Sequence, residues 1–339
     1  METEEKTFKI LCIDGGGIKG LYSATILQHL EEQFDCCISD RFDMLCGTST
    51  GGLIALALSL RIPAAEIVQF YREEGANIFP QYTKSRWIHR FISGFKQITW
   101  NGKFSDEPLK KALQKVFGEK VLGQSENLLC IPSYTITDAR PWIFKFDHTE
   151  GKLNRDNGIR YVDVALATSA APTYFPVAEN PDYHNKQFID GGVWANNPTL
   201  VGFLEALTYF VGKDKEFKKL SILSVSSLTL TGGTRTGKKR NRSFFGWRDS
   251  LFETSMTGQS HFTDHFMTKM NEVNDVDVNY LRIPSPDISH EQAGQVQLDV
   301  ATENALDLLA GKGDDQGQRF RKDPRIAEFF AHPKHYKTH

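Results

Sequence analysis

The sequence contains little cysteine, no long apolar run and almost no net charge. Its five cysteines are an odd number and form no C-x-x-C pair, which argues against a disulfide framework and favours a reducing compartment. The longest apolar run, LIALALSL at 53–60, is far shorter than the roughly 20 residues that a membrane-spanning helix needs. A net charge of −2 gives no overall attraction to nucleic acid, so we expect no DNA or RNA polymer as a partner.

Signals for export and for metal binding are also absent. The residues METEEKTFK at the start contain no basic segment followed by an apolar one, so we expect no secretory signal and a cytoplasmic location. The ten histidines include no H-E-x-x-H pattern, and we expect neither a metal ion nor another cofactor. With 40% hydrophobic and 24% charged residues, the composition is that of a globular protein with a large core.

Short apolar runs alternate with helical patterns along the chain. Strands are expected at Phe8–Ile13, Phe42–Cys46, Leu128–Thr137, Trp142–Phe146, Gln187–Ile189 and Leu220–Ser226. Helices are expected at Gly20–Gln33, Thr50–Leu60, Pro63–Arg72, Ser105–Phe117, Pro198–Phe210 and Gln297–Leu309. This alternation predicts an α/β protein with a mainly parallel central sheet covered on both faces. Because no internal repeat or linker interrupts the chain, we expect a single domain over residues 1–339.

The stretch GTSTGG, at residues 47–52, follows an expected strand and precedes an apolar helix. Within it, Gly47, Ser49 and Gly51 spell G-x-S-x-G. A serine in such a turn adopts a strained conformation that exposes its oxygen at the end of the sheet, and the two glycines avoid backbone collisions. The partial positive charge of the following helix N-terminus favours an alkoxide. Ser49 is therefore the candidate nucleophile.

A nucleophilic serine needs a base. Asp190 ends an expected strand and is followed by Gly191 and Gly192, which places a carboxylate at the edge where α/β active sites assemble. His184 is a second candidate for this role, because serine hydrolases commonly use a histidine. An Asp-Gly-Gly sequence is also an ordinary turn, so the assignment of Asp190 depends on Ser49 and on the glycines near the start of the chain.

Those glycines lie in DGGGIKG, residues 14–20, where Gly15, Gly17 and Gly20 have the G-x-G-x-x-G spacing of a dinucleotide fingerprint. Such a site needs an acidic residue at the end of a second strand about 20 residues later. The sequence there reads as helix and polar turn, with Cys36–Ile38 as a short strand candidate. We therefore interpret the amides of Gly15, Gly16 and Gly17 as an oxyanion hole.

Two further segments combine basic and aromatic residues. In KSRWIHRFISGFKQITW, residues 84–100, Trp87 and Phe91 lie on one face of an expected helix. This helix either packs on the core or contacts lipid headgroups at a membrane surface. The second segment, residues 231–247, is either a solvated loop or an anion-binding element. Its basic residues are Arg235, Lys238, Lys239, Arg240 and Arg242.

Four blocks together resemble the signature blocks of patatin-like phospholipases, in the order of that family. They are DGGGIKG, GTSTGG, SAAPTYFP at 169–176 and DGGVWANNP at 190–198. The resemblance implies a three-layer α/β/α fold, with Ser49 as nucleophile, Asp190 as general base and the Gly15–Gly17 amides as oxyanion hole. Lys19 stands where the family carries lysine or arginine. The resemblance weakens after Pro198, and residues 199–339 are a candidate regulatory part.

The resemblance implies hydrolysis of phospholipid carboxylic esters at a membrane surface, on the inner face when the enzyme is active. The middle and the later part of the chain, including TDARPWIFKFDH, resemble a bacterial subgroup that a cyclic dinucleotide activates in anti-phage defence. A cyclic dinucleotide and a second copy of the chain are thus candidate partners. The alternatives are a constitutive lysophospholipase or esterase, and a non-catalytic lipid-binding or storage protein of the same fold.

Overall fold

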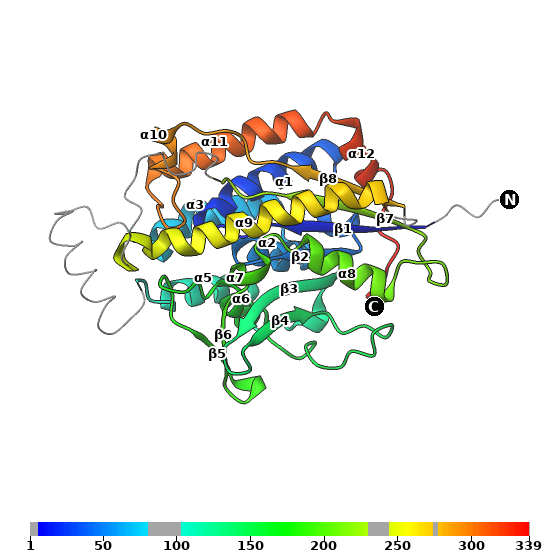
Figure 1. Cartoon of the computed structure of the whole chain (residues 1–339), viewed down its shortest axis with the longest axis horizontal. Coiled ribbons are helices and arrows are strands. Elements are labelled where there is room, and N and C mark those ends of the chain that lie inside the picture. The colour runs from blue at the N-terminus through cyan, green and yellow to red at the C-terminus, as the bar shows by residue number, and fades with distance from the viewer. Residues whose placement is uncertain (1–5, 81–102, 230–243, 274–276, 339) are drawn as a thin grey trace.

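In a computed structural model, residues 6–80, 103–229, 244–273 and 277–338 are described (Figure 1). Their strands form one sheet in the order β5-β6-β3-β2-β1-β7-β8, and β4 also pairs with β3. The strands are β1 (Thr7–Ile13), β2 (Met44–Gly47), β3 (Leu128–Thr135), β4 (Arg140–Lys145), β5 (Ala178–Asn180), β6 (Lys186–Asp190), β7 (Lys219–Val225) and β8 (Val278–Ile283). From β3 to β8 this order is parallel, whereas β4, β5 and β6 pair antiparallel.

Helices cover both faces of the sheet. The α-helices are α1 (Gly20–Phe34), α2 (Thr50–Ser59), α3 (Ala64–Ile78), α5 (Glu107–Phe117), α6 (Tyr161–Ser169), α7 (Gly192–Ala195), α8 (Thr199–Tyr209), α9 (Phe244–Val273), α10 (His290–Ala293), α11 (Glu303–Phe320) and α12 (Pro324–Phe330). Gly202 of α8 lies against Cys46, and Gly52 of α2 lies against Ile131. Ile131 directly follows Cys130, the register partner of Cys46, so α2 and α8 pack on opposite faces.

The two strands that carry the candidate catalytic residues meet along one edge of β3. β4 pairs with β3 from Cys130 to Thr135 and therefore occupies the other edge. β2 runs parallel to β3 and reaches Cys130, whereas β6 runs antiparallel and ends with Asp190 opposite Ser133. The carboxyl ends of β2 and β6 thus approach each other from opposite directions, and Pro132 lies between them.

The expected α/β fold with a mainly parallel sheet is confirmed. All six expected strands are present, with ends that differ by one or two residues. The short strand considered at Cys36–Ile38 is wrong, because these residues lead into a 3-10 turn at Ile38–Asp40. The strands and helices expected above do not include α6, α9 and β8, at Tyr161–Ser169, Phe244–Val273 and Val278–Ile283.

One expected helix begins in the wrong place. The pattern at Gln297–Leu309 predicts a helix, but α11 begins at Glu303, after Thr302, whose hydroxyl accepts the N–H of Ala305 at 3.3 Å. The residues before it are not helical because the Leu298 carbonyl oxygen instead accepts the N–H of Ile18 at 2.9 Å. This segment therefore braces the glycine-rich turn after β1.

The chain segment after α12 crosses the end of the sheet remote from Ser49. Asp43, just before β2, is fully buried, and one of its oxygens accepts the backbone N–H groups of His335 and Tyr336, both at 2.7 Å. Its other oxygen accepts the N–H of Lys9 in β1 at 2.7 Å. One buried carboxylate therefore ties the late segment to both central strands.

Among the described residues, none of the helices combines the length and the apolar character that crossing a bilayer requires.

Candidate active site

Ser49 occupies the turn between β2 and α2. Its φ of 54° lies in the left-handed region that residues other than glycine rarely adopt, so the turn is strained. A Cβ at Gly47 would lie 2.0 Å from the Gly51 carbonyl oxygen, and one at Gly51 would lie 2.2 Å from the Ile13 carbonyl oxygen. Both positions therefore require glycine, as the motif predicts for a nucleophile elbow.

A threonine at the end of α6 fixes the backbone of this elbow. The N–H of Ser49 donates to Oγ1 of Thr168 at 3.0 Å, and that hydroxyl donates to the Pro132 carbonyl oxygen at 2.6 Å. Two residues further on, the Ala170 carbonyl oxygen accepts the N–H of Asp190 at 2.9 Å. One short segment thus holds the backbone of both candidate catalytic residues.

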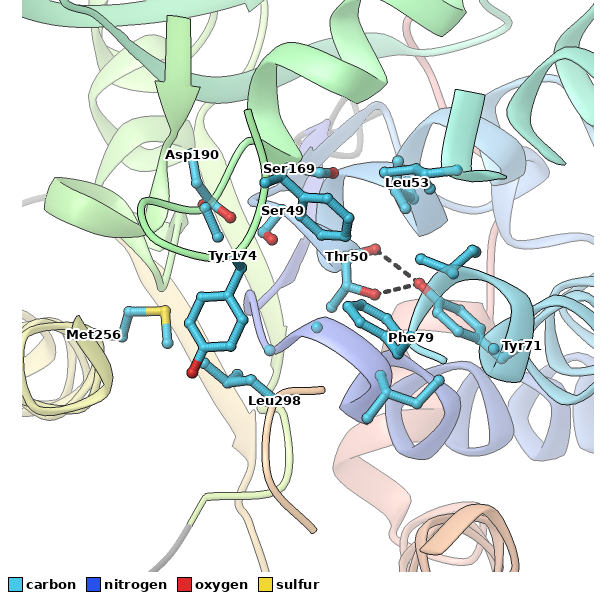
Figure 2. Close-up of a pocket in the computed structure, with 18 of the residues that line it drawn as sticks. Ser49, Thr50, Leu53, Tyr71, Phe79, Ser169, Tyr174, Asp190, Met256 and Leu298 are labelled. Carbon is cyan, nitrogen blue, oxygen red and sulfur yellow. Dashed lines mark hydrogen bonds between the residues drawn. The ribbon is translucent and has the colours of Figure 1, made fainter. Parts of the chain in front are cut away.

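Asp190 ends β6 beside Ser49 (Figure 2) and is 1% exposed. Its Oδ1 accepts the N–H of Gly192 at 2.7 Å. Burial raises the pKa of the carboxyl group to about 7, while hydrogen bonds from the Ser49 hydroxyl and from Gly192 oppose the rise. A carboxylate with a pKa near neutrality is suited to accept a proton from a hydroxyl at physiological pH.

Two glycines frame this aspartate. A Cβ at Gly191 would lie 2.3 Å from the Pro132 carbonyl oxygen, so the position directly after Asp190 requires glycine. A Cβ at Gly192 would lie 3.0 Å from both Oδ1 of Asp190 and the sulfur of Met256. Side chains at these positions would therefore push against the backbone of β3 or against the carboxylate itself.

Of the three amides expected to form an oxyanion hole, one is paired and two have no acceptor among the described residues. The N–H of Gly15 donates to the Asn196 carbonyl oxygen at 3.0 Å, so the prediction that Gly15 belongs to the oxyanion hole is wrong. The N–H groups of Gly16 and Gly17 have no acceptor among the described residues, and both residues line the pocket at Ser49. These two amides are free to bind an oxyanion.

Gly17 has a φ of 58°, and a Cβ there would lie 2.2 Å from the Leu298 carbonyl oxygen. Both the conformation and the close approach require glycine.

A buried ion pair lies behind this turn. Asp14, the last residue before the glycines, is fully buried and contacts the Arg282 guanidinium of β8 through both carboxylate oxygens, at 3.2 and 2.6 Å. The same guanidinium donates to the Ser224 hydroxyl of β7 at 2.5 Å. Burial raises the pKa of Asp14, and the charge and hydrogen bonds of Arg282 oppose that rise. The pair thus joins the turn to the far strands of the sheet.

Lys19 is buried at the end of the short 3-10 helix Gly17–Lys19. Burial lowers the pKa of its ammonium group, and the negative charge of Glu253 in α9 partly offsets this effect. Its side chain therefore lies within the protein between the glycine-rich turn and α9, rather than extending into solvent.

The pocket at Ser49 has a cavity volume of about 50 Å³ and is surrounded mainly by apolar side chains. Figure 2 shows Asp190, Ser49 and Tyr174 together on one side and Leu53 and Tyr71 on the other. Met256 of α9 and Leu298 complete the wall near Tyr174. We call this space the catalytic pocket.

Some residues that the sequence suggests for membrane or anion contact lie outside the described part of the chain. Trp87 and Phe91 belong to residues 81–102, and the basic residues Arg235, Lys238, Lys239, Arg240 and Arg242 belong to residues 230–243, so both sets lie outside the described residues. His184, the alternative base, lies in the turn before β6 and does not line the catalytic pocket. No group of three or more histidine, cysteine or acidic side chains suited to a metal occurs in the described residues.

Several residues of this site were missed in the sequence. Thr168, Arg282 and Met256 have no motif of their own, and they reach the site from α6, β8 and α9, which are distant from Ser49 in the sequence. Of these, Thr168 directly precedes the block SAAPTYFP, and its position beside that block is the one available signal.

A strained serine at an apolar pocket is suited to esters of fatty acids, because the apolar walls favour an alkyl chain and exclude water from the reacting carbonyl. The protein is a lipid hydrolase of the serine type.

Its family follows from comparison with known proteins. A family model described as "Patatin-like phospholipase" matches residues 11–203, which is more than half of the chain, and the chain belongs to this family. The expected family, fold and enzyme class are thereby confirmed.

Two curated relatives match almost the whole chain. A "cGAMP-activated phospholipase" of Pseudomonas aeruginosa (strain BWHPSA011 / Pa011) is 32% identical over 327 residues, covering 96% of this chain and 92% of that protein. A protein of the same description from Vibrio cholerae serotype O1 is 29% identical, covering 96% of this chain and 95% of the relative. Among solved structures, human GIVD cytosolic phospholipase A2 has a TM-score of 0.45 and 11% identity, covering 98% of this chain and 62% of that one.

Proposed function

We propose that Ser49 and Asp190 form the catalytic dyad with which this phospholipase cleaves the carboxylic esters of phospholipids. The observation that carries the proposal is the buried Asp190 carboxyl group, which lies beside a strained serine and has a pKa of about 7. A base with this pKa needs no histidine to deprotonate the serine hydroxyl. The amides of Gly16 and Gly17 complete the site as oxyanion donors.

In the first half of the reaction, Asp190 accepts the proton of the Ser49 hydroxyl while Oγ bonds to the ester carbonyl carbon. The carbonyl oxygen takes up the negative charge and accepts hydrogen bonds from Gly16 and Gly17. When the tetrahedral intermediate collapses, the ester C–O bond breaks, and Asp190 transfers its proton to the leaving alcohol.

In the second half, a water molecule gives a proton to Asp190 and attacks the acyl group on Ser49. Collapse of the second intermediate breaks the bond to Oγ, and the proton returns from Asp190 to the serine oxygen. The fatty acid leaves, and the dyad is restored.

The pH dependence tests the role of Asp190. The free enzyme needs the ionised carboxylate, so kcat/KM should rise with pH up to about 7 and level off above it. Well below this pKa, each unit of pH should lower the rate about tenfold, because the ionised fraction falls by that factor. The measurement is kcat/KM for a neutral ester between pH 5 and 9. A flat profile through this range would contradict the assignment.

We further propose that cGAMP activates the enzyme at the inner face of the cytoplasmic membrane. Support comes from the two relatives that are named as cGAMP-activated and that this chain matches over more than nine tenths of their length. Residues 199–339 belong in this proposal to the same single domain as the dyad. They contribute β7 and β8 to the sheet, and Met256 and Leu298 to the catalytic pocket.

Fatty acid release from phospholipid vesicles tests this activation. Adding cGAMP should raise the rate about 5- to 150-fold, the usual range of an allosteric coupling. A cyclic dinucleotide of different base composition is the ligand control, and Ser49→Ala is the protein control. Equal rates with and without cGAMP would instead identify a constitutive lipase, and mass spectrometry of the products would give its positional preference.

A further inference from the structure

A second hollow lies next to the catalytic pocket. Its cavity volume is about 330 Å³, and three residues, Leu53, Phe70 and Tyr71, line both spaces. We call the second space the distal groove. Its other lining residues are Ala57, Ile62, Glu66, Ile67, Leu113, Lys115, Val116 and Phe117. The residues come mainly from α2, α3 and α5, so the groove lies between these three helices.

The helical periodicity indicates that the catalytic pocket and the distal groove are continuous, because the same helix faces line both. On α2, the lining residues Leu53 and Ala57 follow Ser49 at steps of four, which places them on one face of the helix. On α5, Leu109 lines the catalytic pocket, while Leu113 and Phe117 line the distal groove at the same spacing.

On α3 the order is reversed. Gly75 lines the catalytic pocket, Tyr71 lines both spaces, and Ile67 lines the distal groove. On each of the three helices, one turn therefore lines the catalytic pocket and a neighbouring turn of the same face lines the distal groove.

The volumes indicate where a long acyl chain can extend. The cavity volume of the catalytic pocket, about 50 Å³, lies well below the range of about 300–1,000 Å³ that is usual for ligand sites. The distal groove, at about 330 Å³, falls in the range of about 300–1,000 Å³ that is usual for ligand sites. A long chain whose carbonyl lies at Ser49 needs more space than the catalytic pocket provides, and the adjoining distal groove offers that space.

The chemistry of the groove favours an alkyl chain over a headgroup. Glu66 and Lys115 are the charged residues among those that line it, and both are exposed. The ammonium of Lys115 already pairs with Glu74 at 2.8 Å. Leu113 and Phe117 are buried in the wall. A phosphate would meet the negative charge of Glu66 and a cation that is already neutralised.

We propose that the distal groove binds the far end of the acyl chain that the enzyme removes, and so sets its chain-length preference. This inference rests on the proposed role of Ser49. Tyr71 is the fixed part of the boundary, because its hydroxyl hydrogen-bonds both the side chain and the carbonyl oxygen of Thr50 (Figure 2). Leu53 and Phe70 are only partly buried, and the acyl chain passes beside these two side chains. Ala57 lies eight residues along α2 from Ser49, or about 12 Å at 1.5 Å per residue.

Filling the groove tests the proposal. Ala57→Phe adds a ring at its floor, and Val116→Trp adds an indole at its rim, where the native side chain is 36% exposed. Gln114→Trp is the matched control, because Gln114 is exposed on the same helix and does not line the groove. The readout is kcat/KM for p-nitrophenyl palmitate divided by kcat/KM for p-nitrophenyl butyrate, measured with cGAMP present.

The ratio should fall about tenfold or more in both groove variants and stay unchanged in Gln114→Trp. Each methylene that leaves an apolar site costs about fourfold in kcat/KM, equivalent to about 0.8 kcal/mol. If Ala57→Phe fails to fold by circular dichroism, Val116→Trp carries the test, since its site is at the surface.

Two results would overturn the proposal while leaving the dyad intact. The first is an unchanged ratio in folded groove variants. The second is a loss on two-chain phospholipid with no loss on palmitate ester, which would assign the groove to the second chain. Failure of the proposed function would give another result: the wild-type protein would show no hydrolysis of either ester that the Ser49→Ala variant lacks.

Discussion

Ser49→Ala is expected to lower kcat for ester hydrolysis about 10⁴-fold or more, because the acyl group then has no oxygen to bond to. The substitution should leave the fold unchanged. Serine and alanine have the same difficulty in adopting a φ of 54°, so the strain of the elbow is equal in both proteins. The measurement is fatty acid release together with thermal unfolding of both proteins.

Asp190→Asn is the matched change in the base. An asparagine has the same shape, and its oxygen can still accept the N–H of Gly192, but it takes no proton from Ser49. We expect a loss of about 10³- to 10⁴-fold, comparable to losses in other serine hydrolases when the proton path is broken. Wild-type turnover by either folded variant would rule out the dyad.

A fluorophosphonate probe separates an enzyme from a storage protein with the same fold. The probe should label the wild type at Ser49, should not label Ser49→Ala, and should label Asp190→Asn much more slowly, because the serine then lacks its base. Absence of labelling in the wild type would favour the non-catalytic alternative.

Arg282→Met is expected to destabilise the protein by about 3–5 kcal/mol, the usual cost of leaving a buried charge without its partner. Asp14 is fully buried, and both of its carboxylate oxygens contact this guanidinium. Total stabilities are about 5–15 kcal/mol, so the loss is a large fraction of the whole. Chemical denaturation of the variant and of the wild type measures it.

The control for this prediction is the double variant Asp14→Asn with Arg282→Met. Removing both charges should restore most of the lost stability, because no isolated ion is then buried. Two results would contradict this. One is a free energy of unfolding for Arg282→Met within about 1 kcal/mol of the wild type. The other is a double variant that is no more stable than Arg282→Met, which would show that the unpaired Asp14 charge does not cause the loss.

The local features of the site could be predicted from the sequence. The strand, glycine and serine of the elbow are consecutive in the chain, and their conformation depends on backbone sterics that the motif already describes. The same holds for the glycines after Asp190, where a side chain would meet the backbone of β3.

The long-range features could not be predicted. Nothing in the sequence indicates that β6 shares an edge of β3 with β2, since strand pairing joins segments that are far apart in the chain. The same limit explains the error at Gly15. A run of glycines indicates where amides are accessible, but Asn196, far along the chain, decides which of them is already occupied. The pKa of Asp190 also depends on burial that only the fold creates.

The meeting of β2 and β6 on one edge of β3 has a consequence for the proposed regulation of this enzyme. Nucleophile and base are attached to the same rigid strand, so motion of the outer helices leaves their separation unchanged. The walls of the catalytic pocket are different, because they include residues of three separate segments: α3, α9 and the segment before α11. Under the proposed activation by cGAMP, the resting enzyme would keep an assembled dyad but exclude lipid from the catalytic pocket. Such a form would react with small electrophiles and not with lipid, and activation would change which molecules enter the pocket rather than the chemistry of the dyad.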